Sequence, residues 1–192
     1  MFDQAIKYLL DVVFGLFTYA FLLRFAMQWL RAPFRNTIGQ ALTALTDWAV
    51  KPMRRLLPGF GGIDWATLLL AWLAQYLWSL AIALVMGGLA VMGGPGFAVL
   101  ALLAAVLLVK AALWLLIVAV FAQAIVSWVA PDGPAAGLLN ALTYRFLSPI
   151  RRRVPPVGGT LDLSPLILIV LLQLVLMLPV AWLEGAVLML FR

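Results

Sequence analysis

Long apolar stretches alternate with short polar segments along this chain, and each apolar stretch is long enough to cross a lipid bilayer. A helix of about 20 mostly apolar residues spans the hydrocarbon core. Stretches of this kind cover Tyr8–Leu30, Trp65–Met86, Phe97–Val129 and Leu163–Phe191. The pattern therefore predicts four transmembrane helices, the third of which is longer than one span needs.

Two of the polar segments contain a shorter amphipathic pattern. In the first, apolar residues recur at helical spacing at Ile38, Leu42, Leu45 and Ala49. In the second, the apolar stripe consists of Leu138, Leu139, Leu142 and Phe146. Both predicted helices are too short and too polar to span, so we expect them to lie flat in the membrane interface.

Local signals predict where these two helices begin and end. Thr37, followed three residues later by Gln40, fits a capping box at the start of the first helix. The segment Asp132-Gly133-Pro134 marks the start of the second. Pro52 and Pro149 are expected to limit the two helices, because the residue before a proline disfavours the helical region.

The pattern occurs twice. Aligned pairs recur at nearly the same separation: Trp29 with Trp128, Arg24 with Gln123, Asp64 with Asp162 and Gln75 with Gln173. Residues 1–92 and 97–192 each contain a span, an interfacial helix and a second span. Because two spans return the chain to its starting side, both halves have the same orientation, which predicts a parallel repeat about a pseudo-twofold axis along the membrane normal. The predicted fold class is an all-α, polytopic integral membrane protein.

Composition excludes several classes of protein. Hydrophobic residues make up 66% of the 192 residues and charged residues 10%, against roughly 45–50% and about 25% in soluble domains. The chain has no cysteine and no histidine, which excludes disulfides, thiolate zinc sites, Ser-His-Asp triads and His-ligated haem within it. It also contains no P-loop, GxSxG or HExxH motif. We therefore expect no enzymatic activity, no metal and no cofactor.

Basic residues gather in the two segments that carry the interfacial helices. The first segment holds Arg31, Arg35, Lys51, Arg54 and Arg55; the second holds Arg145, Arg151, Arg152 and Arg153. The loop Gly87–Gly96 between the halves has none. By the positive-inside rule, both basic segments should be cytoplasmic and both termini outside.

A basic phrase bounded by proline and glycine appears in each half: KPMRRLLPGFGG from Lys51 and SPIRRRVPPVGG from Ser148. One interpretation is topological, since arginines hold a loop inside and the prolines and glycines turn the chain. The other is a docking surface for anionic lipid headgroups or other membrane proteins, with each basic residue worth about 1 kcal/mol near an anionic leaflet. The candidate docking residues are Arg54, Arg55, Arg151, Arg152 and Arg153. Neither interpretation needs nucleic acid as a partner.

Several charged residues lie within or next to the spans. The repeat places Asp11 and Lys110 at equivalent depth on the first and third spans, and because an unpaired charge in hydrocarbon is costly we predict that they contact each other. Glu184 is the competing partner for Lys110. Whether 97–109 extends the third span or forms a separate interfacial segment is left open.

Asp64 and Asp162 directly precede the second and fourth spans. As favoured N-cap residues they are expected to cap these helices, and Ser164-Pro165 offers a further cap in the second half. The alternative for Asp64 is an ion pair with Arg24 of the same half.

These motifs resemble the YggT family of bacterial inner-membrane proteins, which has chloroplast and cyanobacterial relatives. The resemblance rests on RFAMQW, IVSW, KPMRRLLPGFGGID and SPIRRRVPPVGGTLDLSP. It implies a small multi-pass protein of the bacterial inner membrane with no established chemistry. Roles discussed for relatives include osmotic-stress tolerance, division or envelope organisation, and assembly of membrane cytochromes. We expect a non-enzymatic scaffold or assembly factor; the alternative is a small ion or osmolyte transporter, or an accessory subunit of one.

Overall fold

The computed structural model describes residues 2–87, 94–131, 133–154 and 162–190, and helices dominate all four segments. Four of its helices, or runs of helix, are long and apolar enough to cross a membrane. The elements in chain order are α1 (Phe2–Trp29), α2 (Thr37–Leu56), α3 (Trp65–Val85), α4 (Gly94–Val129), α5 (Pro134–Arg153), α6 (Ser164–Val175), the π-helical turn η2 (Leu176–Val180) and α7 (Ala181–Met189). The four predicted spans are thereby confirmed.

The third span is one continuous helix. Residues 97–109 extend α4 without a break, so the open question about that segment is resolved in favour of a long span. The fourth span runs from Ser164 to Met189 and includes Pro179, which lies inside η2. A π-helical turn at this point accommodates a proline that has no N–H for the regular helical hydrogen bond.

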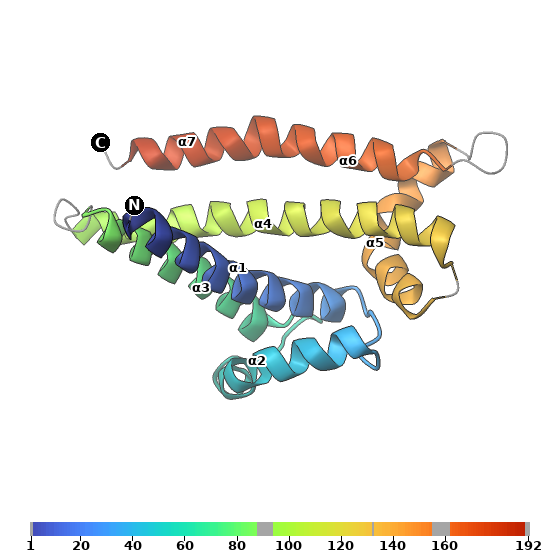
Figure 1. Cartoon of the computed structure of the whole chain (residues 1–192), viewed down its shortest axis with the longest axis horizontal. Coiled ribbons are helices and arrows are strands. Elements are labelled where there is room, and N and C mark those ends of the chain that lie inside the picture. The colour runs from blue at the N-terminus through green and yellow to red at the C-terminus, as the bar shows by residue number, and fades with distance from the viewer. Residues whose placement is uncertain (1, 88–93, 132, 155–161, 191–192) are drawn as a thin grey trace.

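The helices are arranged so that the ends of the spans sort into two groups (Figure 1). The start of α1, the end of α3, the start of α4 and the end of α7 lie together at the left of the view. α5 lies at the opposite end of α4, and α2 begins near the opposite end of α1 and runs back below it. α1 and α4 therefore run in the same direction, as the parallel repeat requires.

The halves are not related by a twofold axis, however. α4 packs against α3 as well as α1, whereas α6 and α7 contact α4 but not α1 in the described residues. A twofold axis that maps α3 onto α6 and α4 onto α1 would require contacts between α1 and the fourth span. The predicted pseudo-twofold arrangement is wrong in this respect, and the fourth span lies along the outer side of α4 (Figure 1).

Small side chains allow the first three spans to approach closely. The buried residues of α3 are all small: Ala66, Thr67, Ala71, Ala74, Ser79 and Ala83. α1 presents Thr18 and Ala20 among its buried residues, and α4 presents Ala104 and Ala111. Lipid tails are as apolar as leucine, so helices in a membrane gain stability from close van der Waals packing, which small residues permit.

Larger apolar residues pack where the interfacial helices meet the spans. One cluster joins Met27 and Ala20 of α1 to Leu42 of α2 and Leu138 and Leu142 of α5. A second, within the second half, is built by Ile117, Val120, Leu147, Leu168, Leu172, Leu176 and Val180. These clusters fix α2 and α5 against the ends of the spans.

The predicted ends of the interfacial helices need correction. α2 and α5 continue past Pro52 and Pro149 to Leu56 and Arg153. Each proline ring is exposed, so the missing hydrogen bond costs little where lipid headgroups or water can reach the backbone. The cap of α2 is Asn36, whose side chain accepts a hydrogen bond from the Gly39 N–H at 2.6 Å, and not the predicted Thr37.

Two further predictions for these helices concern where α5 begins and which residues form the buried stripe of each helix. α5 begins at Pro134 after Gly133, as expected, while Asp132 lies outside the described residues. In α5, Leu138 and Leu142 are buried, in agreement with the predicted stripe. In α2, Thr46 is buried and accepts a hydrogen bond from Arg24 of α1. Ile38, which belongs to the predicted apolar stripe, is exposed.

The arrangement of the span ends can be tested in a chain that has no native cysteine. Single cysteines replacing Gln40 and Asn140, both exposed on the interfacial helices, should react with an impermeant thiol reagent from the same side of the membrane. A cysteine replacing Asp3 should react only from the other side. Labelling of Gln40 and Asn140 variants from opposite sides would contradict the fold.

Candidate functional site

The basic phrase of the first half is tied to the following span by an ion pair whose carboxylate is buried. Arg54, in the last turn of α2, donates to Asp64 Oδ2 from Nη2 at 2.5 Å and from Nε at 3.2 Å. Asp64 is the N-cap of α3, where its Oδ1 accepts the Thr67 N–H and its Oδ2 the Thr67 hydroxyl. The Asp64 side chain is only 1% exposed. The loop between α2 and α3 is thus closed by one carboxylate that also starts the span.

The charge of Asp64 is stabilised by these contacts. Burial opposes ionisation, but the hydrogen bonds from Arg54 and Thr67 outweigh it and hold the pKa of Asp64 below its ordinary value. The folded-state pKa is then lower than the unfolded one, which is about 3.9. The pair therefore stabilises the fold above about pH 4, and this stabilisation is lost as the pH falls through the lowered pKa.

The second half repeats this ion pair. Arg151, in the last turn of α5, donates from Nε to Asp162 Oδ2 at 2.8 Å. Asp162 Oδ1 accepts the N–H of Ser164, the first residue of α6, at 2.9 Å. Asp162 is 27% exposed, so the second pair is more accessible than the first. We call Arg54–Asp64 and Arg151–Asp162 the loop clamps.

The structure corrects three of the predictions. Asp64 caps α3 as expected, but its partner is Arg54 and not Arg24. Ser164 is not the cap of α6 but its first residue, and Asp162 lies one residue before the cap position, which Leu163 occupies. The sequence analysis interpreted Arg54 and Arg151 as topological signals or as docking residues. Their repetition together with Asp64 and Asp162 was the signal that could have revealed the pairs.

Arg24 instead joins the first span to the interfacial helix. The Arg24 side chain is 6% exposed and donates from Nη1 to Asp47 Oδ1 at 2.7 Å and to the Thr46 hydroxyl oxygen at 2.6 Å. Lys51 pairs with the other Asp47 oxygen at 2.8 Å. Hydrogen bonds from Lys51 and Arg24 lower the pKa of Asp47. The network fixes α2 across the end of α1.

The remaining arginines of the basic phrases are exposed. Arg55, Arg152 and Arg153 follow the clamp arginines directly and make no ion pair within the described residues. The ends of α2 and α5 that carry them lie apart from each other in Figure 1. The five candidate docking residues therefore divide into two clamp residues and three exposed ones, on two separate surfaces.

The deepest charges are paired differently from the prediction. Lys110 Nζ lies 2.7 Å from Glu184 Oε2, so the competing partner forms the pair and the predicted Asp11–Lys110 contact is wrong. Asp11 Oδ1 instead accepts a hydrogen bond from Trp78 Nε1 at 2.7 Å. The Lys110–Glu184 pair links α4 to α7 and thereby holds the fourth span against the third.

Asp11 and Lys110 do line a common hollow. It has a volume of about 250 Å³ and lies between α1, α3 and α4. Gln75 and Trp78 contribute polar atoms to it, and Tyr19 and Trp114 contribute aromatic rings. The hollow can offer a carboxylate, an amide and an ammonium group to a small polar solute. In the described residues, no three His, Cys, Asp or Glu residues gather as a metal site would require.

Comparisons with known proteins agree on one family. The CCB3/YggT family model matches residues 4–85 and 102–183. An uncharacterized protein of Pseudomonas aeruginosa is 37% identical over 179 residues, which cover 92% of this chain and 88% of the relative. The uncharacterized protein YggT of Escherichia coli is 34% identical over 173 residues, 90% of this chain and 87% of the relative. No solved structure matches the chain significantly.

The two loop clamps should differ in their contribution to stability. Arg54→Gln leaves the buried Asp64 carboxylate without its charged partner and should lower the free energy of unfolding by about 2 kcal/mol. Arg151→Gln should cost less than about 1 kcal/mol, because water can reach Asp162. Thermal unfolding of the purified variants in detergent measures the difference. Equal losses would contradict the burial difference between the two carboxylates.

The intramembrane pair is testable by exchanging its charges. Lys110→Glu or Glu184→Lys alone places two like charges together, and an uncompensated charge in a spanning helix costs up to about 3 kcal/mol. Each single variant should therefore yield less folded protein, and Lys110→Glu/Glu184→Lys should restore it. Size-exclusion chromatography of membrane extracts gives the folded fraction. A double variant as poor as the two singles combined would exclude the pair.

Proposed function

The chain belongs to the CCB3/YggT family, and on that premise we propose that it is a non-enzymatic membrane protein that scaffolds other membrane proteins or assists their assembly. The proposal includes a role in envelope organisation under osmotic stress, which the family resemblance implies. Its partners are other membrane proteins and the anionic headgroups of the bilayer.

The observation that carries this proposal is that each basic phrase contains one arginine held in an ion pair and at least one exposed arginine beside it. Arg54 and Arg151 each bind the aspartate before the following span, so in each half the end of the interfacial helix is attached to the start of that span. The adjacent Arg55, Arg152 and Arg153 are exposed. A positive-inside signal requires arginines but no such attachment, whereas a docking surface benefits from guanidinium groups held by a rigid support, because less conformational entropy is lost on binding.

We place the protein in the bacterial plasma membrane with both interfacial helices on the cytoplasmic side. The bias of lysine and arginine towards the segments of α2 and α5 supports this orientation. The exposed tryptophans Trp29, Trp65 and Trp128 at the ends of spans near these helices also support it, since tryptophan favours the membrane interface. The chain termini would then lie outside.

The second candidate function is a small ion or osmolyte transporter, or an accessory subunit of one. The hollow lined by Asp11, Gln75 and Lys110 favours it, because ionisable groups within spans often mark solute pathways. Against a transporter, Lys110 is already neutralised by Glu184 and Asp11 is hydrogen-bonded to Trp78.

The docking proposal is tested by crosslinking in intact membranes. A photoreactive residue at Leu56, which is 78% exposed beside Arg55, should form discrete crosslinks to other membrane proteins. Arg55→Gln removes one charge worth about 1 kcal/mol beside the probe, so the crosslinks at Leu56 should weaken roughly fivefold. Quantitative mass spectrometry of the crosslinked bands measures the loss.

The matched control is Arg35→Gln, which removes the same charge from an exposed arginine outside the two basic phrases. It should leave the crosslinks at Leu56 in place. Crosslinks that survive Arg55→Gln would overturn the docking proposal. Solute flux in proteoliposomes that is lost in Asp11→Asn would support the second candidate instead.

A further inference from the structure

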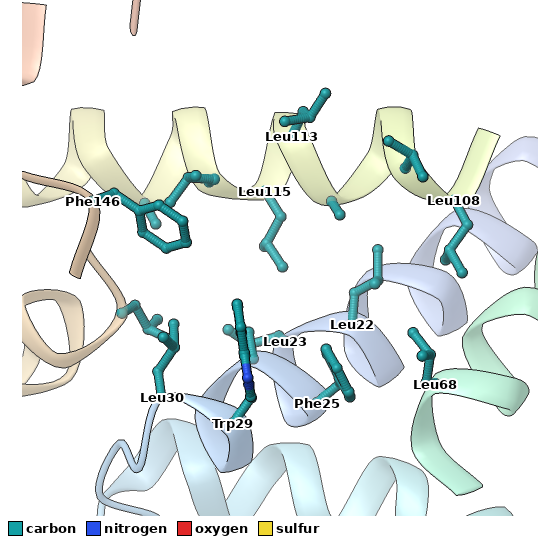
Figure 2. Close-up of a pocket in the computed structure, with 16 residues that line it drawn as sticks. Leu22, Leu23, Phe25, Trp29, Leu30, Leu68, Leu108, Leu113, Leu115 and Phe146 are labelled. Atoms are coloured by element: carbon teal, nitrogen blue, oxygen red, sulfur yellow. The ribbon is translucent and has the colours of Figure 1, made fainter. Parts of the chain in front are cut away.

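An apolar cleft separates the two halves of the molecule where α1 and α4 diverge. It has a volume of about 350 Å³ and is lined by side chains of α1, α4 and α5 together with Leu68 of α3. In Figure 2, Leu22 points from α1 into the cleft and Leu115 points into it from α4, with Phe146 of α5 at one end. The volume falls within the roughly 300–1,000 Å³ typical of small-molecule sites.

The lining of this cleft is almost wholly hydrocarbon. All of its lining residues are apolar or aromatic, from Leu22 and Phe25 on α1 to Ala112 on α4. A polar solute would lose its hydrogen bonds there. An acyl chain fits the chemistry of the cleft.

A basic hollow adjoins the cleft at the end near the interfacial helices. Trp29 and Leu30 line both spaces, so the two adjoin each other. The hollow is further lined by Arg31 from the end of α1 and by Asn140, Tyr144 and Arg145 from α5. Each half of the chain therefore contributes one arginine to the same space.

Arg145 is positioned by an aromatic contact, and the backbone of Arg31 is positioned by the turn that ends α1. The Arg145 guanidinium lies 4.9 Å from the centre of the Trp29 ring, a cation–π contact that fixes its position. Arg31 follows the end of α1 with a φ of 55°, a left-handed conformation that favours glycine. In this turn the Ala32 N–H donates to Met27 O and the Arg31 N–H to Gln28 O, a helix-ending motif that usually has glycine where Arg31 stands.

Neither arginine has a carboxylate partner within the described residues. Their guanidinium groups can each present paired N–H donors to a phosphate. Between them and the bilayer interior lies the apolar cleft. A site with two arginines at its mouth and a hydrocarbon-lined interior suits a molecule that carries both a phosphate group and an acyl chain.

We propose that this seam binds an anionic glycerophospholipid, with its phosphate between Arg31 and Arg145 and one acyl chain in the cleft between α1 and α4. The bound lipid fills the space between the halves and contacts both. This site is distinct from the docking residues after the loop clamps, so it stands or fails independently of the proposed function.

The test uses the purified full-length protein and two lipids that differ only in headgroup. Phosphatidylglycerol should raise the Tm in detergent and remain bound in native mass spectrometry, and phosphatidylcholine with the same acyl chains should do neither. Arg31→Gly removes the guanidinium but suits the left-handed backbone, so the variant should fold and bind phosphatidylglycerol about fivefold more weakly. Arg35→Gly, an equal charge change outside the hollow, should bind normally.

A second pair of variants tests the acyl-chain cleft without altering charge. Ala112→Phe fills the cleft from α4 and should abolish the rise in Tm, whereas Ala105→Phe, at an exposed position of α4 outside the cleft, should retain it. Equal stabilisation by both lipids, or normal phosphatidylglycerol binding by Arg31→Gly and Ala112→Phe, would overturn the proposal. Equal stabilisation by glycerol phosphate alone would show a site for a free anion and would also overturn it.

Discussion

Apolar side chains gain little by leaving a lipid environment for a protein interior, and this constraint shapes the whole molecule. Leucine is the most frequent residue of the spans, yet leucine side chains do not by themselves hold the spans together. The contacts between α1, α3 and α4 depend on small residues such as Ala71 and Ala104, which let the backbones approach. In the part of the chain that the structure describes, the fourth span and α1 share no such seam and do not contact each other.

Charged pairs supply the specificity that apolar packing in lipid lacks. The last turn of each interfacial helix contains an arginine that is bound to the aspartate before the following span. Arg24 fixes α2 against α1 through Asp47, and Lys110 holds the fourth span through Glu184. A charge near hydrocarbon is stable only with a partner, so each pair defines one relative position of two elements.

The open arrangement of the spans leaves spaces that side chains do not fill. Because the fourth span packs on α4 and α5 and does not contact α1 in the described residues, the seam between α1, α4 and α5 is left as an apolar cleft with a basic mouth. A smaller polar hollow lies between α1, α3 and α4. The first has the chemistry of a lipid site, and the second offers groups of both charges to a small solute.

The sequence by itself determined the four spans, the two interfacial helices and the repetition of the basic phrases, because these depend on local hydrophobic periodicity and on residue spacing within one element. It also placed Asp64 correctly as a helix cap, a contact between near neighbours. It did not determine that Arg24 meets Asp47, that Lys110 meets Glu184 and not Asp11, or that α2 and α5 continue through their prolines. These outcomes depend on how the helices are rotated and packed against one another. The sequence allows more than one carboxylate as the partner of a given cation. Only the tertiary structure decides which carboxylate lies at the same depth in the membrane and on the facing side of a neighbouring helix.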